Sequence, residues 1–204
     1  MPSVVWTIVV AAGAGQRFGR PKQFEMLGDR RVVDWSVDVA RAASDGVVVV
    51  LPPGHGGVEG GTTRSESVRN GLARVPDGAD IVCVHDAARP FASSTLFTRV
   101  IAAVEEGADA AIPAVAVADT IKEIDTDGVV VRTPPRDRLV AVQTPQAFRA
   151  ASLRTAHENG GDATDDAALV EAIGGRVVVV EGDPENRKLT VPDDLEWARR
   201  RVAS

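Results

Sequence analysis

Residues 9–23 read VVAAGAGQRFGRPKQ, a run in which a β-branched strand ends in small residues and glycines and then in cations. Glycines let backbone N–H groups approach phosphate oxygens, because no Cβ stands in the way. Arg17, Arg20 and Lys22 follow and can neutralise the charge of a polyphosphate. The segment therefore predicts a phosphate-binding loop after the first strand.

Three familiar phosphate-binding loops fit this segment poorly. A Walker A loop needs Gly-Lys before Ser or Thr, whereas the lysine here follows proline and precedes glutamine. A dinucleotide-binding fingerprint needs an acidic residue after the second strand, but residues 51–53 are Leu-Pro-Pro, and Gly19 comes one residue late. A protein-kinase glycine loop requires further motifs, such as His-Arg-Asp, that the sequence lacks. The arginine and the Pro-Lys pair that follow the glycines therefore carry most of the signal.

Outward from this loop, short β-branched runs alternate with helical patterns. We expect strands at about 4–11, 46–51, 81–85, 110–115 and 176–181, and helices at about 32–43, 65–74, 95–106, 150–158, 165–173 and 192–202. Residues 47–50 and 177–180 are valine at every position, as strands covered on both faces require. The alternation predicts an α/β, Rossmann-like, three-layer fold with a mostly parallel central sheet.

Residues from about 116 to 139 interrupt this alternation. Two β-like segments, 119–124 and 129–133, are joined by Asp-Thr-Asp-Gly, which is a hairpin turn signal. An isolated hairpin is only marginally stable in water, so we expect this protruding arm to pack against a second subunit. The alternative is an edge hairpin that covers its own domain. No repeat or linker divides the 204 residues, and we expect one domain over 1–204 without a fused second one.

Composition limits the possible functions. Hydrophobic residues make up 44% and charged residues 25% of the chain, an ordinary globular mixture, and the net charge of −6 argues against a general nucleic-acid surface. No apolar run approaches the roughly 20 residues that cross a bilayer, and the start lacks signal-peptide features, so we expect a cytoplasmic protein without a membrane partner. Cys83 is the only cysteine, which excludes an intrachain disulfide and a thiolate metal cage. A buried thiol on an apolar strand is expected to be inert packing.

Six further motifs follow the loop in order. They are Gly60-Gly61-x-x-Arg64-x-x-Ser67-Val68, Val84-His85-Asp86-Ala87-Ala88-Arg89-Pro90, Asp119-Thr120-x-Lys122, Gln143-Thr144-Pro145-Gln146, Thr164-Asp165-Asp166 and Asn186-x-Lys188-x-Thr190. With residues 11–23 they resemble the signature of the sugar-nucleotide pyrophosphorylase and cytidylyltransferase superfamily. Within it, the chain closely resembles the 2-C-methyl-D-erythritol 4-phosphate cytidylyltransferase family of non-mevalonate isoprenoid biosynthesis, nearly from end to end.

The resemblance implies a nucleotide-diphospho-sugar transferase type of fold, with the arm used for forming a homodimer. It also implies a magnesium-dependent enzyme that transfers CMP from CTP to 2-C-methyl-D-erythritol 4-phosphate and releases pyrophosphate. A ribitol 5-phosphate cytidylyltransferase on the same scaffold is the nearest alternative, because both acceptors are phosphorylated sugar alcohols. A dinucleotide-binding oxidoreductase and a non-catalytic nucleotide sensor are more distant alternatives. Nothing in the residues themselves distinguishes cytosine from uracil.

The resemblance also implies a role for individual residues. The implied catalytic residues are Arg17, Lys22, Arg136 and Lys188. The implied CTP-binding residues are Ala11, Ala12, Gly13, Gly15, Gly61, Arg64, Ser67 and Asp86. The implied acceptor-binding residues are Arg89, Thr120, Arg136, Thr144, Thr164 and Lys188, of which Thr120 and Arg136 would reach the neighbouring subunit's site.

Asp86 is the predicted metal ligand. It follows an apolar strand, and ligands of open α/β sheets bind at the carboxyl ends of strands. Mg²⁺ typically takes one or two protein carboxylates together with phosphate oxygens and water. By contrast, we interpret Asp165 and Asp166 as charges at a helix N-terminus, where the macrodipole favours them.

Overall fold

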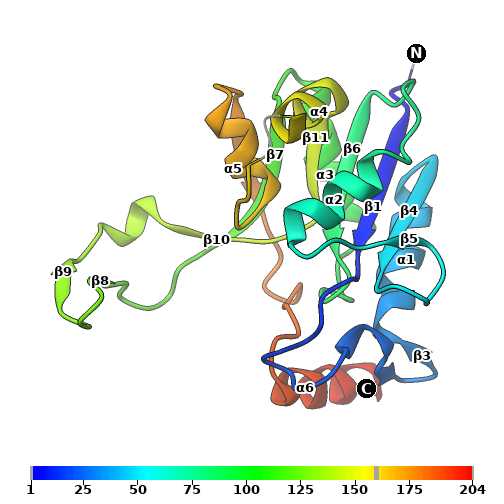
Figure 1. The fold of residues 1–204 in the computed structure, drawn as a ribbon. Coiled ribbons are helices and arrows are strands. Elements are labelled where there is room, and N and C mark those ends of the chain that lie inside the picture. The colour runs from blue at the N-terminus through cyan, green and yellow to red at the C-terminus, as the bar shows by residue number, and fades with distance from the viewer. Residues whose placement is uncertain (1, 159–160, 204) are drawn as a thin grey trace.

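The computed structural model describes residues 2–158 and 161–203 and shows three layers around one sheet (Figure 1). The described residues form an eight-stranded sheet in the order β10-β7-β11-β6-β1-β4-β5, with β12 paired to β7. Its strands are β1 (Val5–Val10), β4 (Gly46–Leu51), β5 (Val58–Glu59), β6 (Ile81–Asp86), β7 (Ala110–Ala116), β10 (Val140–Val142), β11 (Gln146–Arg149) and β12 (Val177–Glu181). The predicted α/β class is confirmed.

The register of the central strands creates a common edge. Strand β1 pairs in parallel with both β4 and β6, and Val10 lies opposite Val50 on one side and Asp86 on the other. The carboxyl ends of these strands therefore meet where the glycine loop begins. Strands β10 and β11 are antiparallel to β7, and β11 is also antiparallel to β6. These two short strands were not predicted, and they make the sheet mixed rather than purely parallel.

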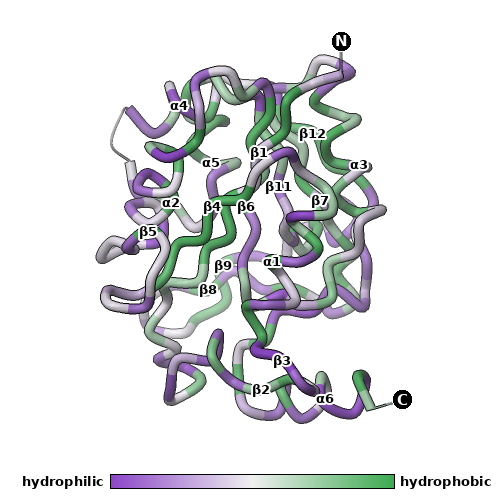
Figure 2. The backbone as a smooth tube through the Cα atoms, turned by 90° about the vertical axis from the view of Figure 1, so that its right-hand side faces the viewer, coloured by the Kyte–Doolittle hydropathy of each residue, from purple (hydrophilic) through white to green (hydrophobic). Residues whose placement is uncertain are grey.

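Helices cover both faces of the sheet. Helices α1 (Val32–Ala43) and α3 (Ser94–Glu105) pack on one face, and α2 (Arg64–Leu72), α4 (Ala150–Glu158) and α5 (Asp166–Ala172) pack on the other. Neighbouring strand residues serve opposite cores, as Ile8 and Val9 do in β1. Strands buried on both faces are hydrophobic along their length, which Figure 2 shows for β4.

A third, smaller core lies at the carboxyl edge of the sheet. Helix α6 (Pro192–Ala203), red in Figure 1, lies below that edge, as does the small hairpin of β2 (Met26–Leu27) and β3 (Arg30–Arg31). The members of this core are Phe18, Leu27, Val32, Leu189, Leu195 and Ala198. The core therefore joins the glycine loop, which contains Phe18, to the segment before α6, which contains Leu189.

Helix boundaries follow local capping signals. Ser93 precedes α3 and accepts a hydrogen bond from the Leu96 amide, and Pro192 occupies the first position of α6, where its fixed φ suits a helix start. Thr63 caps α2 in the same way through the Glu66 amide. This last cap matters for function, because it fixes the start of the helix that carries Arg64.

Residues 117–139 form an extension that projects away from the sheet (Figure 1). Strands β8 (Glu123–Ile124) and β9 (Val130–Arg132) pair antiparallel in it, and a 3-10 turn, η2 (Arg136–Arg138), follows them. All residues from 118 to 133 are exposed. The hairpin therefore does not cover its own domain, and that alternative is wrong. Of the helices in the described ranges, none has the length and apolarity needed to span a bilayer.

Candidate active site

A cleft of about 620 Å³ opens at the carboxyl ends of β1 and β6. Its walls are the glycine loop, the segment before and at the start of α2, the turn after β6 and the segment before α6. The predicted site residues that line it are Ala11, Ala12, Gly13, Gly15, Arg17, Lys22, Gly61, Arg64, Ser67, Asp86 and Lys188. Residues from four distant parts of the sequence thus meet in one place.

The glycine loop is closed by its own backbone. Gly15 has a φ of +68°, and a Cβ on it would lie 1.9 Å from the Arg20 carbonyl oxygen. The amides of Phe18 and Gly19 both donate to the Gly15 carbonyl at 2.8 Å. Gly15 is therefore required both for its left-handed conformation and for its lack of a side chain. The buried Phe18 ring anchors the loop in the third core, while Arg17 stays exposed at the cleft.

Lys22 is the half-buried cation of this loop. It lies at the start of the 3-10 turn η1 (Lys22–Phe24), where burial lowers its pKa, and the nearby Lys188 and Arg17 lower it further. Arg17, Lys22 and Lys188 all line the cleft, and three cations in one cleft stabilise a bound polyanion. Arg20, by contrast, does not line the cleft and donates to the Glu25 carboxylate at 3.0 Å. The expectation that Arg20 contributes to phosphate binding is therefore not supported.

Asp86 ends β6 and is held by two cations. Its Oδ1 accepts from Arg64 Nε at 3.2 Å, and its Oδ2 accepts from Lys188 Nζ at 2.6 Å. Burial would raise the pKa of Asp86, but Arg64 and Lys188 outweigh burial, and the pKa lies well below its ordinary value. The carboxylate is therefore ionised near neutral pH. Lys188 is kept beside it because the next amide, that of Leu189, donates to the Ala88 carbonyl at 2.8 Å.

The described residues fit a divalent cation only where phosphate and water supply most of its ligands. Within these ranges, no group of three or more His, Cys, Asp or Glu side chains is placed to hold a metal. Asp86 is a single carboxylate, and each of its oxygens keeps a lone pair beyond the cation it already contacts. A hard cation that takes its other ligands from phosphate and water is compatible with this donor set.

The segment that carries Gly61 and Ser67 faces the start of the glycine loop. Ser67 Oγ accepts from the Gly61 amide at 3.1 Å and donates to the Thr63 carbonyl at 2.9 Å. A Cβ on Gly60 would lie 2.1 Å from the Ala12 Cβ, so the two loops approach as closely as glycine permits. The loops therefore touch at Gly60 and Ala12, and the small residues beside this contact leave this part of the cleft wall free of bulky side chains.

Behind the cleft, Arg64 also pairs with a buried carboxylate. Arg64 Nη1 donates to Asp166 Oδ2 at 2.7 Å, and Asp166 Oδ1 contacts His157 Nε2 at 2.9 Å. Asp165 does cap α5, since it accepts from the Ala168 amide at 3.1 Å. Asp166 is not merely a helix N-terminal charge, because its side chain is completely buried in this network. Sequence reasoning placed Asp166 at a helix N-terminus but not in this network, and it gave His157 no role, since nothing in the spacing of residues 64, 157 and 166 signals their contact.

Two predicted acceptor-binding residues lie beside the cleft rather than in its wall. Arg89 donates to the carbonyls of Asn186 and Val142 at 2.7 and 3.2 Å. Thr144 is buried behind Asp86, whose backbone amide donates to Thr144 Oγ1 at 3.0 Å. In this arrangement both side chains brace the turn after β6.

Three further predicted acceptor-binding residues are remote or exposed, whereas Lys188 lines the cleft. Thr120 and Arg136 belong to the extension, where Arg136 Nη1 donates to the Ala118 carbonyl at 2.7 Å. Thr164 is exposed just before α5. The structure therefore does not bring Thr120, Arg136 or Thr164 into the wall of this cleft.

Strand β6 carries two side chains of reactive types, Cys83 and His85, and neither is suited to catalysis. Burial raises the pKa of the Cys83 thiol to about 12, which agrees with the predicted inert packing. Burial lowers the pKa of His85 to about 4, so its imidazole is neutral near pH 7. Neither group supplies a nucleophile or a general base in the cleft.

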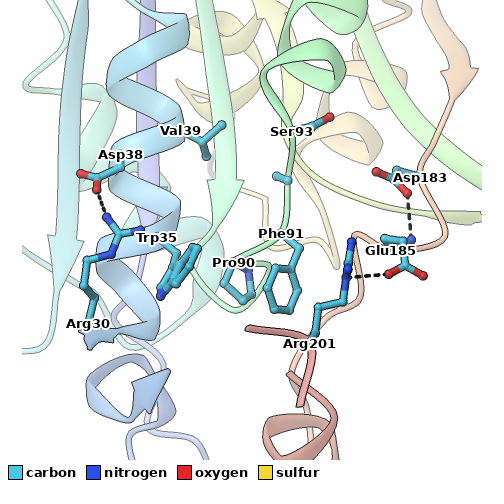
Figure 3. Close-up of a pocket in the computed structure, with 11 residues that line it drawn as sticks. Arg30, Trp35, Asp38, Val39, Pro90, Phe91, Ser93, Asp183, Glu185 and Arg201 are labelled. Atoms are coloured by element: carbon cyan, nitrogen blue, oxygen red, sulfur yellow. Dashed lines mark hydrogen bonds and ion pairs between the residues drawn. The ribbon is translucent and has the colours of Figure 1, made fainter. Parts of the chain in front are cut away.

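A second cavity of about 460 Å³ lies between α1 and α6, away from the cleft (Figure 3). Trp35 and Phe91 form its aromatic wall. Its arginines are already paired with carboxylates: Arg30 with Asp38, and Arg201 with Glu185 at 2.8 Å. The charges here neutralise one another locally, so this cavity lacks the cation cluster of the cleft.

The sequence matches the 2-C-methyl-D-erythritol 4-phosphate cytidylyltransferase family over residues 5–203. The curated enzyme of that name from Rhodococcus opacus is 46% identical, over 97% of this chain and 95% of that protein. The one from Frankia casuarinae is 44% identical, over 98% of this chain and 81% of that protein. A bifunctional IspD/IspF enzyme from Sphingopyxis alaskensis is 44% identical, but this chain spans only 54% of its length.

Solved structures agree in fold. The 2-C-methyl-D-erythritol 4-phosphate cytidylyltransferase of Thermus thermophilus superposes with a TM-score of 0.83 at 35% identity, covering 97% of this chain and 98% of that one. A 4-diphosphocytidyl-2C-methyl-D-erythritol synthase from Anaerococcus prevotii gives a TM-score of 0.85 at 30% identity, covering 99% of both chains.

Proposed function

The chain belongs to the 2-C-methyl-D-erythritol 4-phosphate cytidylyltransferase family, and from this premise we propose that the cleft is its active site. The chain is a nucleotidyltransferase that transfers CMP from CTP to 2-C-methyl-D-erythritol 4-phosphate and releases pyrophosphate. The relatives described above are named for this acceptor, which favours it over ribitol 5-phosphate. The observation that carries the site assignment is the meeting of Arg17, Lys22 and Lys188 around a backbone loop shaped for phosphate.

The reaction is an in-line displacement at the α-phosphorus of CTP. An oxygen of the acceptor phosphate forms the new P–O bond while the bond to the β-phosphate oxygen breaks, and pyrophosphate leaves with that electron pair. A phosphate monoester is already anionic near neutral pH, so no general base is required. This agrees with the neutral, buried His85. Catalysis then rests on positioning and on electrostatic stabilisation of the charge that spreads over the phosphate oxygens.

Each wall of the cleft has a proposed task. Arg17, Lys22 and the loop amides hold the triphosphate and stabilise the transition state, while Lys188 draws the acceptor phosphate toward the α-phosphorus. The CTP base lies against residues 11–12 and the segment with Gly61 and Ser67, beside Arg64. Both segments line the cleft and carry small side chains there, which supports this placement.

A divalent cation, such as Mg²⁺, is proposed to bind through Asp86. The ionised carboxylate supplies one ligand, and triphosphate oxygens and water supply the others. When bound, the cation neutralises phosphate charge in the ground and transition states.

The exposed arm is proposed to complete the site of a second subunit. Thr120 and Arg136 lie on an extension that projects away from the sheet (Figure 1), so their predicted acceptor contacts require a neighbouring copy. Ile124, Val130 and Val131 are more than half exposed, and apolar side chains on a hairpin are stabilised by burial. We propose a cytoplasmic homodimer in which Arg89, Thr144 and Thr164 support the acceptor side from the main domain.

Substitution of Lys22 tests the site assignment. We expect Lys22→Ala to lower kcat for pyrophosphate release by at least about 10²-fold, since electrostatic stabilisers of a transition state commonly contribute this much. The circular dichroism spectrum should not change. The matched control is Arg20→Ala. Arg20 belongs to the same loop, but its side chain does not line the cleft and pairs with Glu25. A Lys22→Ala enzyme with wild-type kcat would remove Lys22 from the mechanism.

A further inference from the structure

Arg64 is the only residue of the cleft wall, among the described residues, that ion-pairs with two carboxylates at once. Its Nε faces Asp86 Oδ1 at 3.2 Å, and its Nη1 donates to Asp166 Oδ2 at 2.7 Å. Asp86 belongs to the cleft, whereas Asp166 lies behind it and is fully buried. The guanidinium is thus held from the rear by a charge that no substrate can contact.

The rear carboxylate is itself anchored on both sides. Its Oδ1 accepts from His157 Nε2 at 2.9 Å, and the His157 side chain is almost completely buried at the end of α4. The segment before α5 is tied to α2 by two further contacts: Thr63 Oγ1 donates to Asp162 at 2.8 Å, and the Ala163 amide donates to Ser65 Oγ at 3.3 Å. The position of the Asp166 carboxylate relative to Arg64 is therefore fixed by several independent contacts.

The charges of this network balance only when Asp166 is counted. Asp86 is contacted by two cations, Arg64 and Lys188, and cannot neutralise both. Asp166 supplies the second negative charge, since Arg64 and His157 outweigh the effect of burial and keep the pKa of Asp166 below its ordinary value. Without that charge, Arg64 would have Asp86 as its only anionic partner, and the cleft would gain a net positive charge.

We propose that Asp166 is a positioning residue for cytidylyl transfer, which acts by holding Arg64 so that Asp86 and Lys188 keep their working geometry. Asp166 touches no substrate and works through Arg64 alone. Its loss lets the guanidinium turn fully onto Asp86 and compete there with Lys188. Turnover then falls because reacting groups are misplaced, whereas anion binding does not weaken, because the cleft has become more positive. This inference rests on the proposed function.

The test compares two neighbouring isosteric substitutions. We expect Asp166→Asn to lower kcat at least tenfold while the Kd for inorganic pyrophosphate, measured by titration calorimetry, stays the same or tightens. The matched control is Asp165→Asn, which removes the adjacent carboxylate from the same helix start but keeps a good N-cap. Asp165 also accepts from the Gln146 amide at 2.9 Å, and this contact is kept when the Gln146 amide turns over to accept from the asparagine. For that control we expect both quantities to stay within twofold of the wild type.

Two results would overturn the proposal. One is an Asp166→Asn enzyme with kcat within twofold of the wild type. The other is a parallel loss of kcat and pyrophosphate affinity, as general damage to the fold would produce. Should Asp166→Asn fail to fold, His157→Phe removes one anchor of Asp166 but keeps Asp166 itself, together with Arg64, Asp86 and Lys188. That variant should lose kcat by about three- to tenfold with unweakened pyrophosphate binding, and unchanged kcat would contradict the proposal. A folded wild type that never releases pyrophosphate would instead refute the proposed function.

Discussion

His85 lies in a directed chain of hydrogen bonds beneath the cleft. The Asp86 amide donates to Thr144 Oγ1 at 3.0 Å, so the Thr144 hydroxyl is free to donate its own hydrogen to His85 Nδ1 at 3.1 Å. With Nδ1 as the acceptor, Nε2 carries the proton and donates to the Arg89 carbonyl at 3.2 Å. The chain needs a neutral imidazole, which agrees with the pKa of about 4 that burial produces.

This neutral histidine predicts a pH dependence of stability. The pKa of His85 is about 4 when folded and about 6.5 when unfolded, so in this window the unfolded chain binds the extra proton. The contribution of the neutral His85 to the free energy of unfolding is therefore fully present above about pH 6.5. This contribution is lost as the pH falls toward 4. Urea denaturation should show about 2 kcal/mol less stability at pH 5 than at pH 7. The variant His85→Gln should lose this difference, and an identical difference in both proteins would contradict the assignment.

At the same scale, contiguous motifs grouped candidate residues that the structure brings into one cleft, whereas long-range pairing could not be predicted from the sequence. Gly15, Arg17 and Lys22 lie within one loop, so their grouping can be read from the chain. The pairing of Arg64 with Asp166 joins residues far apart in sequence and depends on how α2 and α5 pack. No local pattern encodes such a contact.

At the scale of elements, the arm formed by residues 117–139 carries apolar side chains that its own domain leaves exposed. Ile124 and Val130 are paired across its two strands and are 58% and 54% exposed, so a second subunit can bury both. We expect the wild type to sediment as a dimer and Ile124→Asp/Val130→Asp to sediment as a folded monomer with reduced kcat. The control Glu123→Gln alters a neighbouring exposed position and should remain dimeric. A fully active wild-type monomer would show that the arm does not complete the site.

The predicted boundaries of helices and strands are correct where the hydrophobic pattern extends over many residues. Helices α1 and α4 begin and end as predicted, as does strand β4. Strands β10 and β11 were missed because three or four residues are too few for a pattern, and β10 is exposed. Their pairing with β7 and β6 is decided by the tertiary structure rather than by local sequence.

For the molecule as a whole, charge is organised locally rather than globally. The net charge is −6, yet Arg17, Lys22 and Lys188 converge on one cleft. Because the net charge is negative, an anionic ligand must be met by locally placed cations, and the fold brings these together from opposite ends of the chain. The third core does this by burying Phe18 and Leu189 together.

The most direct test of the central claim is pyrophosphate release from CTP and Mg²⁺, with 2-C-methyl-D-erythritol 4-phosphate and ribitol 5-phosphate compared in parallel. The proposed function predicts turnover with the methylerythritol acceptor and at least about 10²-fold lower kcat/KM with ribitol 5-phosphate, which corresponds to roughly 3 kcal/mol of transition-state binding. Turnover with ribitol 5-phosphate alone would contradict the acceptor assignment. Silence with both acceptors, in protein shown to be folded by circular dichroism, would contradict the assignment of catalysis to this cleft.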